Sequence, residues 1–592
     1  MIPYKGNISL VSTESEETSM KHLQKTLSLL LALVMLLSLV GCVQAPDTTA
    51  SQNISATQPS TTQTTPTTRP TTVPTQPTTQ PTDPTDPTEP TQPEPEKEPL
   101  VYTLTQEEVD NYYVLLDRCE DLALIGENVE EIEVLFEELD AMYNYLYAQN
   151  SIATVHYYAD MKDEALTQRH LDCMDICADA NDAYIQMVRR VYLSDTPAKD
   201  ALFEGWSQQD IAYLLNYDER VVQLNKRNAE ITVEYQAATD DAVKIALFKE
   251  TVLNNNAIAQ IYGYETYYEY ASELIYKRDY GADELENMRR YGKEYLADLY
   301  STALDTFRKN YNRLSSVKQQ SVSAFRFNDY DSIRADHIGR YLQVMPDTME
   351  EHIQNMIKQD SLFTKSNKAM AGAFTISVGD RSYCFFGPGY ANLATVIHEG
   401  GHYYASQYAD LNSIPMDLAE THSQANEWLF LAYLDGKFAA NEYQSVMDYR
   451  FCSDLSTVLV CLMVDEFEQK VYATDVTNFT AADFDAIMDG IVSEYFDPEY
   501  AATNLADMNS YWRQVVVDHP VYYLSYAVSA VAAIDLYTVA QADFEAAKEI
   551  YRKLCEEPLD AGFLANIQAA GLAGPFDESF YKELQEILNN RK

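Results

Sequence analysis

Basic residues and cysteines are scarce in this chain. Its 592 residues include 42 Lys and Arg against 91 Asp and Glu, a formal net charge of −49. A surface this acidic repels phosphate, and no basic stripe offsets it, so we expect no nucleic-acid partner. The eight cysteines are too few for a disulfide scaffold. We expect the seven that follow Cys42 to be apolar or free thiols, although a pair among them would leave no signal in the sequence.

Hydrophobic residues, by contrast, make up 46% of the chain. This fraction is enough for a large packed core, and it excludes a wholly disordered chain. The composition also argues against a fibrous repeat and a multi-span membrane protein.

The N-terminal segment is typical of a targeting signal. Residues 20–42 read MKHLQKTLSLLLALVMLLSLVGC, in which two lysines precede an apolar run. The final LVGC resembles the bacterial lipoprotein signal, whose cysteine is lipidated after cleavage. We therefore expect a signal peptide over residues 1–42, with Met20 as the more natural start. The resemblance implies a lipid anchor on Cys42 and a location on the extracellular face of the bacterial cytoplasmic membrane, at the cell surface.

Residues 43–99 form a Thr/Pro-rich stretch that holds 13 of the 22 prolines. Such a composition has little apolar surface to bury and favours an extended, solvated chain. We predict a disordered linker that separates the anchor from a folded body.

The body, residues 100–592, has few prolines and glycines and reads as mostly α-helical. Apolar residues recur at three- and four-residue spacing, for example over 106–149, 282–309 and 577–590. The clearest strand signal is Ala373–Phe386, two β-rich runs around Gly379 that predict a small hairpin. No second linker follows, so we expect one large unit.

The strongest chemical signal is HEGGH at residues 398–402. On a helix, His398 and His402 project from one face, one turn apart, and could bind one Zn²⁺. Glu399 is displaced around the helix, where it could act as general base. The adjacent glycines, Gly400 and Gly401, weaken a helix and so suggest the close approach of another backbone or of a ligand.

A catalytic zinc site needs a third protein ligand and an open position. The candidates lie on a predicted second helix within SIPMDLAETHSQANEWLFL, residues 413–431. They are Asp417, Glu420, His422 and Glu427. Spacing alone does not choose between Glu420 and Glu427.

This block resembles the thimet oligopeptidase and oligoendopeptidase F family of zinc metallopeptidases. The family carries H-E-x-G-H followed by a helix with E-x-x-S-x-x-x-E, and here residues 420–427 read ETHSQANE. Residues 368–374 (KAMAGAF) and 262–280 are similar to two upstream family segments. The resemblance implies that Glu420 is the third ligand and Glu427 a supporting acid. It also implies one zinc per chain and a two-lobed helical ellipsoid with a deep substrate channel, its zincin-type catalytic core at about 360–535.

A second cluster, VDHPVYYLSYAVSA at residues 517–530, contains one histidine and three tyrosines. An imidazole or phenol near a metal can donate to the oxyanion that forms during amide attack. The family has a histidine followed by several tyrosines in this region. We expect His519 and Tyr526 to serve this role, with Tyr523 next. Tyr522 and Gly387 are tentative substrate-binding residues.

The leading hypothesis is therefore a surface-anchored zinc endopeptidase that cleaves oligopeptides. One alternative is an exopeptidase of carboxypeptidase type on the same fold. The other is a peptide-binding lipoprotein without catalytic activity. The sequence indicates neither the oligomeric state nor the cleavage-site preference.

Overall fold

The computed structural model describes residues 99–206, 208–313, 315, 335–410, 413–437, 440–504, 512–514, 516–517 and 519–590. The predicted signal peptide, the predicted lipid anchor at Cys42 and nearly all of the predicted linker lie outside the described residues. They stay predictions.

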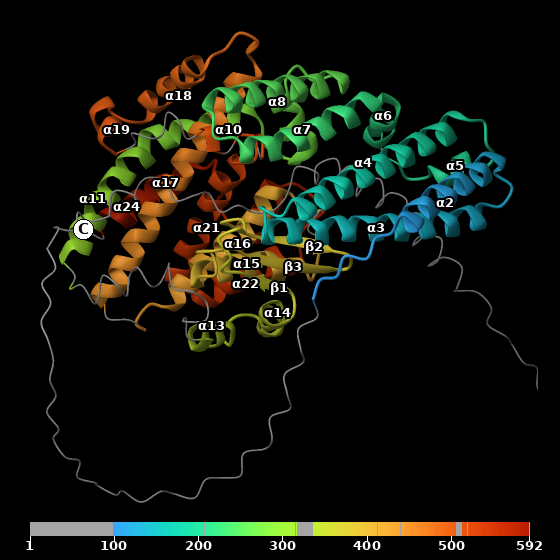
Figure 1. Ribbon diagram of the computed structural model, residues 1–592. Coiled ribbons are helices and arrows are strands. Elements are labelled where there is room, and N and C mark those ends of the chain that lie inside the picture. Colours follow the sequence, from blue (N-terminus) through green and yellow to red (C-terminus); the bar gives the residue numbers. More distant parts are fainter. Residues whose placement is uncertain are drawn as a thin grey trace, which may run out of the picture.

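The described chain is mostly α-helical, as the sequence predicts (Figure 1). Its α-helices are α2 (Gln106–Ile125), α3 (Val129–Ala159), α4 (Glu164–Leu193), α5 (Lys199–Leu202), α6 (Gln208–Asn216), α7 (Glu219–Ala237), α8 (Asp241–Ile261), α9 (Tyr267–Tyr270), α10 (Ala282–Tyr291), α11 (Ala297–Arg313), α13 (Ala335–Leu342), α14 (Asp347–Lys358), α15 (Leu393–Ala405), α16 (Met416–Tyr433), α17 (Ala440–Tyr472), α18 (Ala481–Tyr495), α19 (Pro498–Asn504), α21 (Leu524–Ala542), α22 (Phe544–Glu556), α23 (Phe563–Ala570) and α24 (Glu578–Asn590). Two π-helical turns, η2 (Ala271–Ile275) and η3 (Gly292–Leu296), and one 3₁₀ turn, η5 (Trp512–Gln514), complete the set.

The apolar stretch 106–149 is divided between two helices rather than one. Helix α2 ends at Gly126, whose φ of +67° lies in the left-handed region that glycine adopts readily. A side chain there would also collide with Thr196 and Pro197. The chain therefore turns at Gly126, and α3 packs against both α2 and α4.

Three short strands form a small mixed sheet. They are β1 (Ser361–Phe363), β2 (Ala373–Val378) and β3 (Arg381–Phe386). Strands β2 and β3 are the predicted hairpin, antiparallel around Gly379 at φ +66°. Strand β1, which the sequence analysis does not predict, pairs parallel to β3, so the order β1-β3-β2 leaves β2 at an edge.

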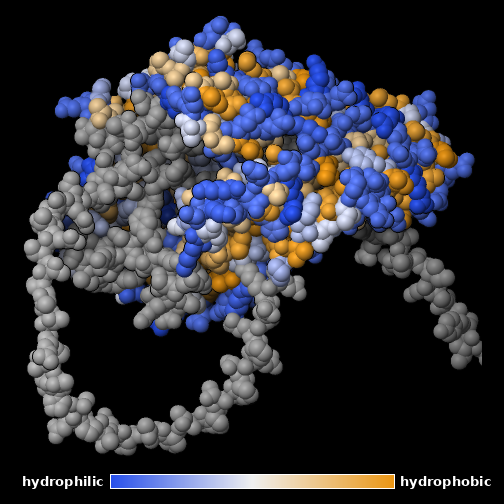
Figure 2. Space-filling model, in the orientation of Figure 1, coloured by the Kyte–Doolittle hydropathy of each residue, from blue (hydrophilic) through white to orange (hydrophobic). Residues whose placement is uncertain are grey.

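Helices α15, α16 and α21 lie beside one another near the sheet (Figure 1). Helix α21 is apolar and long enough to cross a membrane, but it is mostly buried inside the body, where it packs against α16, α17 and α22. It is therefore a core helix. The surface seen in Figure 2 is largely hydrophilic, with scattered hydrophobic residues.

The buried hydrophobic residues form three clusters. The largest runs from α7 to α24 and includes the buried faces of α15, α16 and α21. A second joins α2, α3 and α4 with the segments up to α7. The third packs the end of α3 against β2 and β3, through Tyr158, Phe374 and Phe385. The N-terminal helices thus reach the sheet directly.

The seven cysteines that follow Cys42 are all buried free thiols, as predicted. Their burial means that they act as small hydrophobic residues in the core.

Helices α15 and α16 make an unusually close contact at Gly401. A Cβ there would collide with the backbone carbonyl of His422 and lie 2.7 Å from Cα of Ser423. The close approach of another backbone, expected from the glycine pair, is therefore confirmed. At Gly400, a Cβ would lie 2.9 Å from Cδ1 of Ile353 on α14.

We expect Gly401→Ala to destabilise the protein by about 1–3 kcal/mol, because the added methyl group would push α15 away from the α16 backbone. Gly490→Ala is the matched control. Gly490 lies on α18 with nothing within 4 Å of the added methyl group, so alanine there should stabilise by about 0.5–1 kcal/mol. Urea unfolding measures both changes. Equal effects of the two variants would contradict the proposed close contact.

Candidate metal centre

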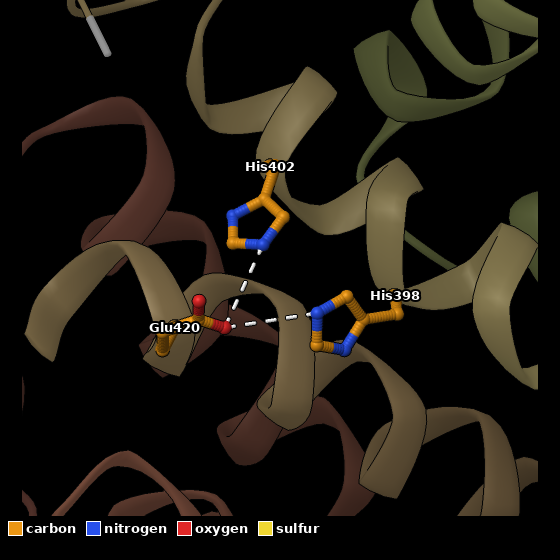
Figure 3. Close-up of side chains that lie close together, drawn as sticks. All are labelled: His398, His402 and Glu420. Atoms are coloured by element: carbon orange, nitrogen blue, oxygen red, sulfur yellow. Dashed lines mark ion pairs between the residues drawn. The ribbon is translucent and has the colours of Figure 1, made fainter. Parts of the chain in front are cut away.

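Three side chains from α15 and α16 converge on one point (Figure 3). Nε2 of His398 lies 3.6 Å from Oε2 of Glu420, and Nε2 of His402 lies 3.7 Å from the same oxygen. One ligand atom from each residue lies within 4.8 Å of the other two. All three side chains are buried. Of the four candidates for third ligand, the structure thus brings Glu420 to the two histidines.

The local sequence explains this arrangement. Asn392 caps α15, since its side chain accepts from the backbone amide of Thr395. The histidines are four residues apart and so share the face that meets α16. Because Gly401 on this face lacks a side chain, α16 comes close enough for Glu420 to reach both imidazoles.

The three residues fit a zinc ion. Two imidazole nitrogens and one carboxylate oxygen form a common catalytic zinc set, in which tetrahedral geometry separates ligand atoms by about 3.4 Å. The observed separations of 3.6 and 3.7 Å are close to this value. In addition, Nε2 of His398 is buried and has no hydrogen-bond partner. A buried orphan nitrogen is costly unless a ligand occupies it.

Glu427 is hydrogen-bonded to the ring nitrogen of His398 that does not face Glu420. Nδ1 of His398 donates to Oε1 of Glu427 over 2.9 Å, which leaves Nε2 directed at Glu420. The other Glu427 oxygen accepts from Arg450, whose Nε donates to Asp454. Burial alone would lower the pKa of His398, but the hydrogen bond and charge of Glu427 outweigh it and raise the pKa to about 9.

The other two candidate ligands, Asp417 and His422, form hydrogen bonds with residues outside the triad. Oδ2 of Asp417 accepts from Tyr280 over 2.6 Å, and Oδ1 accepts from Ser525 over 2.5 Å. The ring of His422 is hydrogen-bonded through Nε2 to the carbonyl of Leu554, 2.9 Å away. Both side chains therefore tie α16 to its neighbours.

Glu399 follows His398 directly on α15. It is fully buried, and Oγ1 of Thr375 on β2 donates to its Oε2 over 2.7 Å. Its other oxygen, Oε1, has no hydrogen-bond partner. Burial raises the pKa of Glu399 to about 7. A carboxyl group with a pKa near neutral suits proton transfer.

The aromatic cluster lies on the far side of Glu420. The hydroxyl of Tyr522 donates to Oε1 of Glu420 and lies 3.1 Å from the hydroxyl of Tyr526. The ring of His519 lies 5.4 Å from that of Tyr522, and Tyr523 lies 5.9 Å from Tyr526. Tyr522, a tentative substrate-binding residue in the sequence analysis, thus has a hydrogen bond to the triad. The oxyanion roles of His519, Tyr523 and Tyr526 stay predictions.

Gly387, a tentative substrate-binding residue, has a packing role in the structure. A Cβ there would collide with the carbonyl of Met370 and lie 2.9 Å from that of Gly372. Its backbone amide donates to the Gly372 carbonyl over 2.8 Å. The glycine therefore lets the segment after β3 pass close to the segment before β2.

Two residues of the site are missed by the sequence analysis. Thr375 shares the face of β2 that meets α15, and strand alternation together with the hairpin prediction could have identified it. Arg450 lies on α17, 23 residues beyond Glu427, and no local pattern connects the two.

Scans of protein-family models and of curated proteins find no match. Solved structures, however, match most of the chain. A structure of PZ peptidase A with an inhibitor has a TM-score of 0.62 at 16% identity and covers 81% of this chain and 97% of that chain. A candidate oligoendopeptidase F from Bacillus anthracis str. Ames has a TM-score of 0.61 at 15% identity, over 84% and 98%. An oligoendopeptidase F from Enterococcus faecium has a TM-score of 0.50 at 12% identity and covers 82% of this chain and 98% of that chain.

These likenesses show that the chain has the fold of oligoendopeptidase F and PZ peptidase A. The mostly α fold and the resemblance that the motifs predict are thus confirmed at the level of structure.

We expect Glu427→Gln to weaken zinc binding by about 10- to 100-fold, because it removes the charge that orients His398. Competition with a chromogenic chelator measures the affinity. Glu545→Gln is the control, since Glu545 is an exposed acid whose one ion pair within the described residues is with Lys548. Unchanged affinity in Glu427→Gln would contradict the supporting role.

Proposed function

We propose that this protein is a zinc-dependent peptidase that hydrolyses internal bonds of oligopeptides. The observation that carries the proposal is the convergence of His398, His402 and Glu420 on one buried point, with the unpartnered Oε1 of Glu399 beside it. The shared fold with oligoendopeptidase F and PZ peptidase A supports the same class of reaction.

Each residue would have a distinct task. His398, His402 and Glu420 would hold the zinc ion, which supplies Lewis-acid polarisation of the scissile carbonyl when bound. Glu399 would take a proton from the attacking water at Oε1 and pass it to the leaving nitrogen. Thr375 fixes the carboxylate for this transfer through its 2.7 Å hydrogen bond. Tyr526 and His519 would donate to the oxyanion.

The edge strand β2 offers a place for a peptide backbone. Within the described part of the chain, β2 has backbone hydrogen bonds to β3 but to no other segment. An extended peptide could add to its free edge, which would give affinity with little sequence preference. Thr375 on the same strand would then place the peptide near Glu399.

We further propose that the body is tethered outside the cytoplasmic membrane through a lipid on Cys42. The support is the LVGC sequence and the Thr/Pro-rich segment that follows it. The exopeptidase alternative keeps the same chemistry with a different product pattern, and the peptide-binding alternative has no chemistry.

The test is cleavage of a mixed pool of short peptides by the zinc-loaded protein, read by mass spectrometry. We expect internal cuts, and we expect Glu399→Gln to lower kcat by about 10²- to 10⁴-fold, because the amide cannot accept the proton. Zinc content is measured in parallel and should be unchanged, since Glu399 is not a ligand. Stepwise loss of terminal residues would favour the exopeptidase. Peptide and zinc binding without cleavage would favour the binding protein.

A further inference from the structure

Among the described residues, two non-glycine residues have a clearly positive φ. They are Lys277 at 51° and Val521 at 63°. The second is the more strained, because a β-branched side chain fits this region poorly. Such a conformation costs about 1–3 kcal/mol and persists where the surroundings hold it. Although 244 positions apart in sequence, the two residues lie on segments in direct contact.

The strained backbone at Val521 is held by three side chains. The hydroxyl of Tyr276 donates to the carbonyl of Pro520 over 2.7 Å, and Nη2 of Arg278 donates to the carbonyl of Val521 over 2.9 Å. The amide of Val521 donates to Oε1 of Glu468 on α17 over 2.8 Å. We call these three side chains the clamp. Three consecutive polar groups of the loop backbone are thus fixed from outside the loop.

Arg278 also connects the loop to α16, the helix that carries Glu420. Its side chain is 1% exposed, and its Nε lies 3.7 Å from Oδ2 of Asp417, one turn before Glu420 on α16. Its Nη2 lies 3.4 Å from Oγ of Ser525, which itself donates to Asp417. A buried guanidinium with a fixed fork of donors can hold several acceptors at once.

The conformation of Lys277 explains how two clamp residues come from one segment. Tyr276 and Arg278 flank Lys277, directly after the π-helical turn η2. The guanidinium of Arg278 lies over the Tyr276 ring, 4.6 Å from its centroid. Both side chains therefore reach the same loop. Single π-helical turns are frequent at functional sites.

The loop in question, residues 519–523, carries the aromatic groups that approach the metal centre. Tyr522 follows Val521 directly and donates to Glu420. His519 lies two residues before Val521 and packs against the Tyr522 ring. A change of φ at Val521 would rotate Tyr522 relative to His519.

We propose that Arg278, together with Tyr276 and Glu468, is a positioning residue that holds Val521 in its strained conformation and so places Tyr522 and His519 at the metal centre. The catalytic part of this proposal rests on the proposed peptidase function. Without the clamp, Val521 relaxes to negative φ and the aromatic groups leave their positions.

A matched control is needed to separate the positioning of the loop by Arg278 from the general effect of removing a buried arginine. Arg289 on α10 is also a largely buried arginine paired with a buried aspartate, since its Nη2 donates to Asp465 over 2.5 Å. Its Nη1 donates to Gln469 over 2.7 Å, and neither contact involves residues 519–523. Arg289→Met therefore reproduces the loss of a buried charge without release of the loop.

The experiment compares the zinc-loaded wild type with Arg278→Met, Arg278→Lys and Arg289→Met. For Arg278→Met we expect kcat to fall about 100-fold, with KM within about threefold of the wild-type value and zinc still bound. The peptide would still bind, but His519 would no longer be in position to donate to the oxyanion. Arg278→Lys should recover part of kcat, since an ammonium can still donate to the Val521 carbonyl. Amide hydrogen exchange over residues 519–523 should rise in Arg278→Met and not in Arg289→Met.

The proposal is overturned if exchange over 519–523 is the same in Arg278→Met and the wild type. It is also overturned if Arg289→Met loses as much kcat as Arg278→Met. If the wild type itself cleaves no peptide, the proposed function fails, and the exchange measurement still decides whether Arg278 holds the loop.

Discussion

The contact between α15 and α16 is the constraint on which the candidate centre depends. Two histidines on one helix could supply two ligands, but a third would have to come from a neighbouring helix whose backbone is close enough for a carboxylate side chain to reach them. Gly401 provides this closeness, since any side chain there would strike the α16 backbone. Although glycine weakens a helix, its lack of a side chain here lets Glu420 come within 3.6 Å of His398 and 3.7 Å of His402.

Buried ion pairs on both sides of this contact connect α15 and α16 to each other and to their neighbours. On one side, Glu427 connects His398 to Arg450. On the other, Asp417 connects α16 to Arg278. Each acid has a cationic partner, as a low-dielectric interior requires. The carboxylate of Glu399 is the contrast, because its Oε1 has no partner. An unsatisfied acceptor therefore lies next to the candidate metal centre.

Local patterns predicted much of the fold and part of the site. The helical body, the hairpin at Gly379 and the pair His398 and His402 follow from periodicity and short-range spacing. Asp417, Glu420, His422 and Glu427 could not be ranked from spacing, because their roles depend on the rotation of α16 against α15. Contacts across long sequence separations, such as that between Arg278 and Val521, leave no local pattern at all. The sequence therefore predicted the elements better than the contacts between them.

The buried thiols have a consequence for the redox chemistry of the body. Burial raises the pKa of Cys119 and of Cys452 to about 12, so almost no thiolate forms at neutral pH. Thiolate is the species that exchanges with disulfides and reacts with oxidants. No disulfide links the described residues, so reduction has no bond to break there. Thiol–disulfide exchange at Cys119 and Cys452 is therefore slow, and the fold of the described residues does not depend on a disulfide.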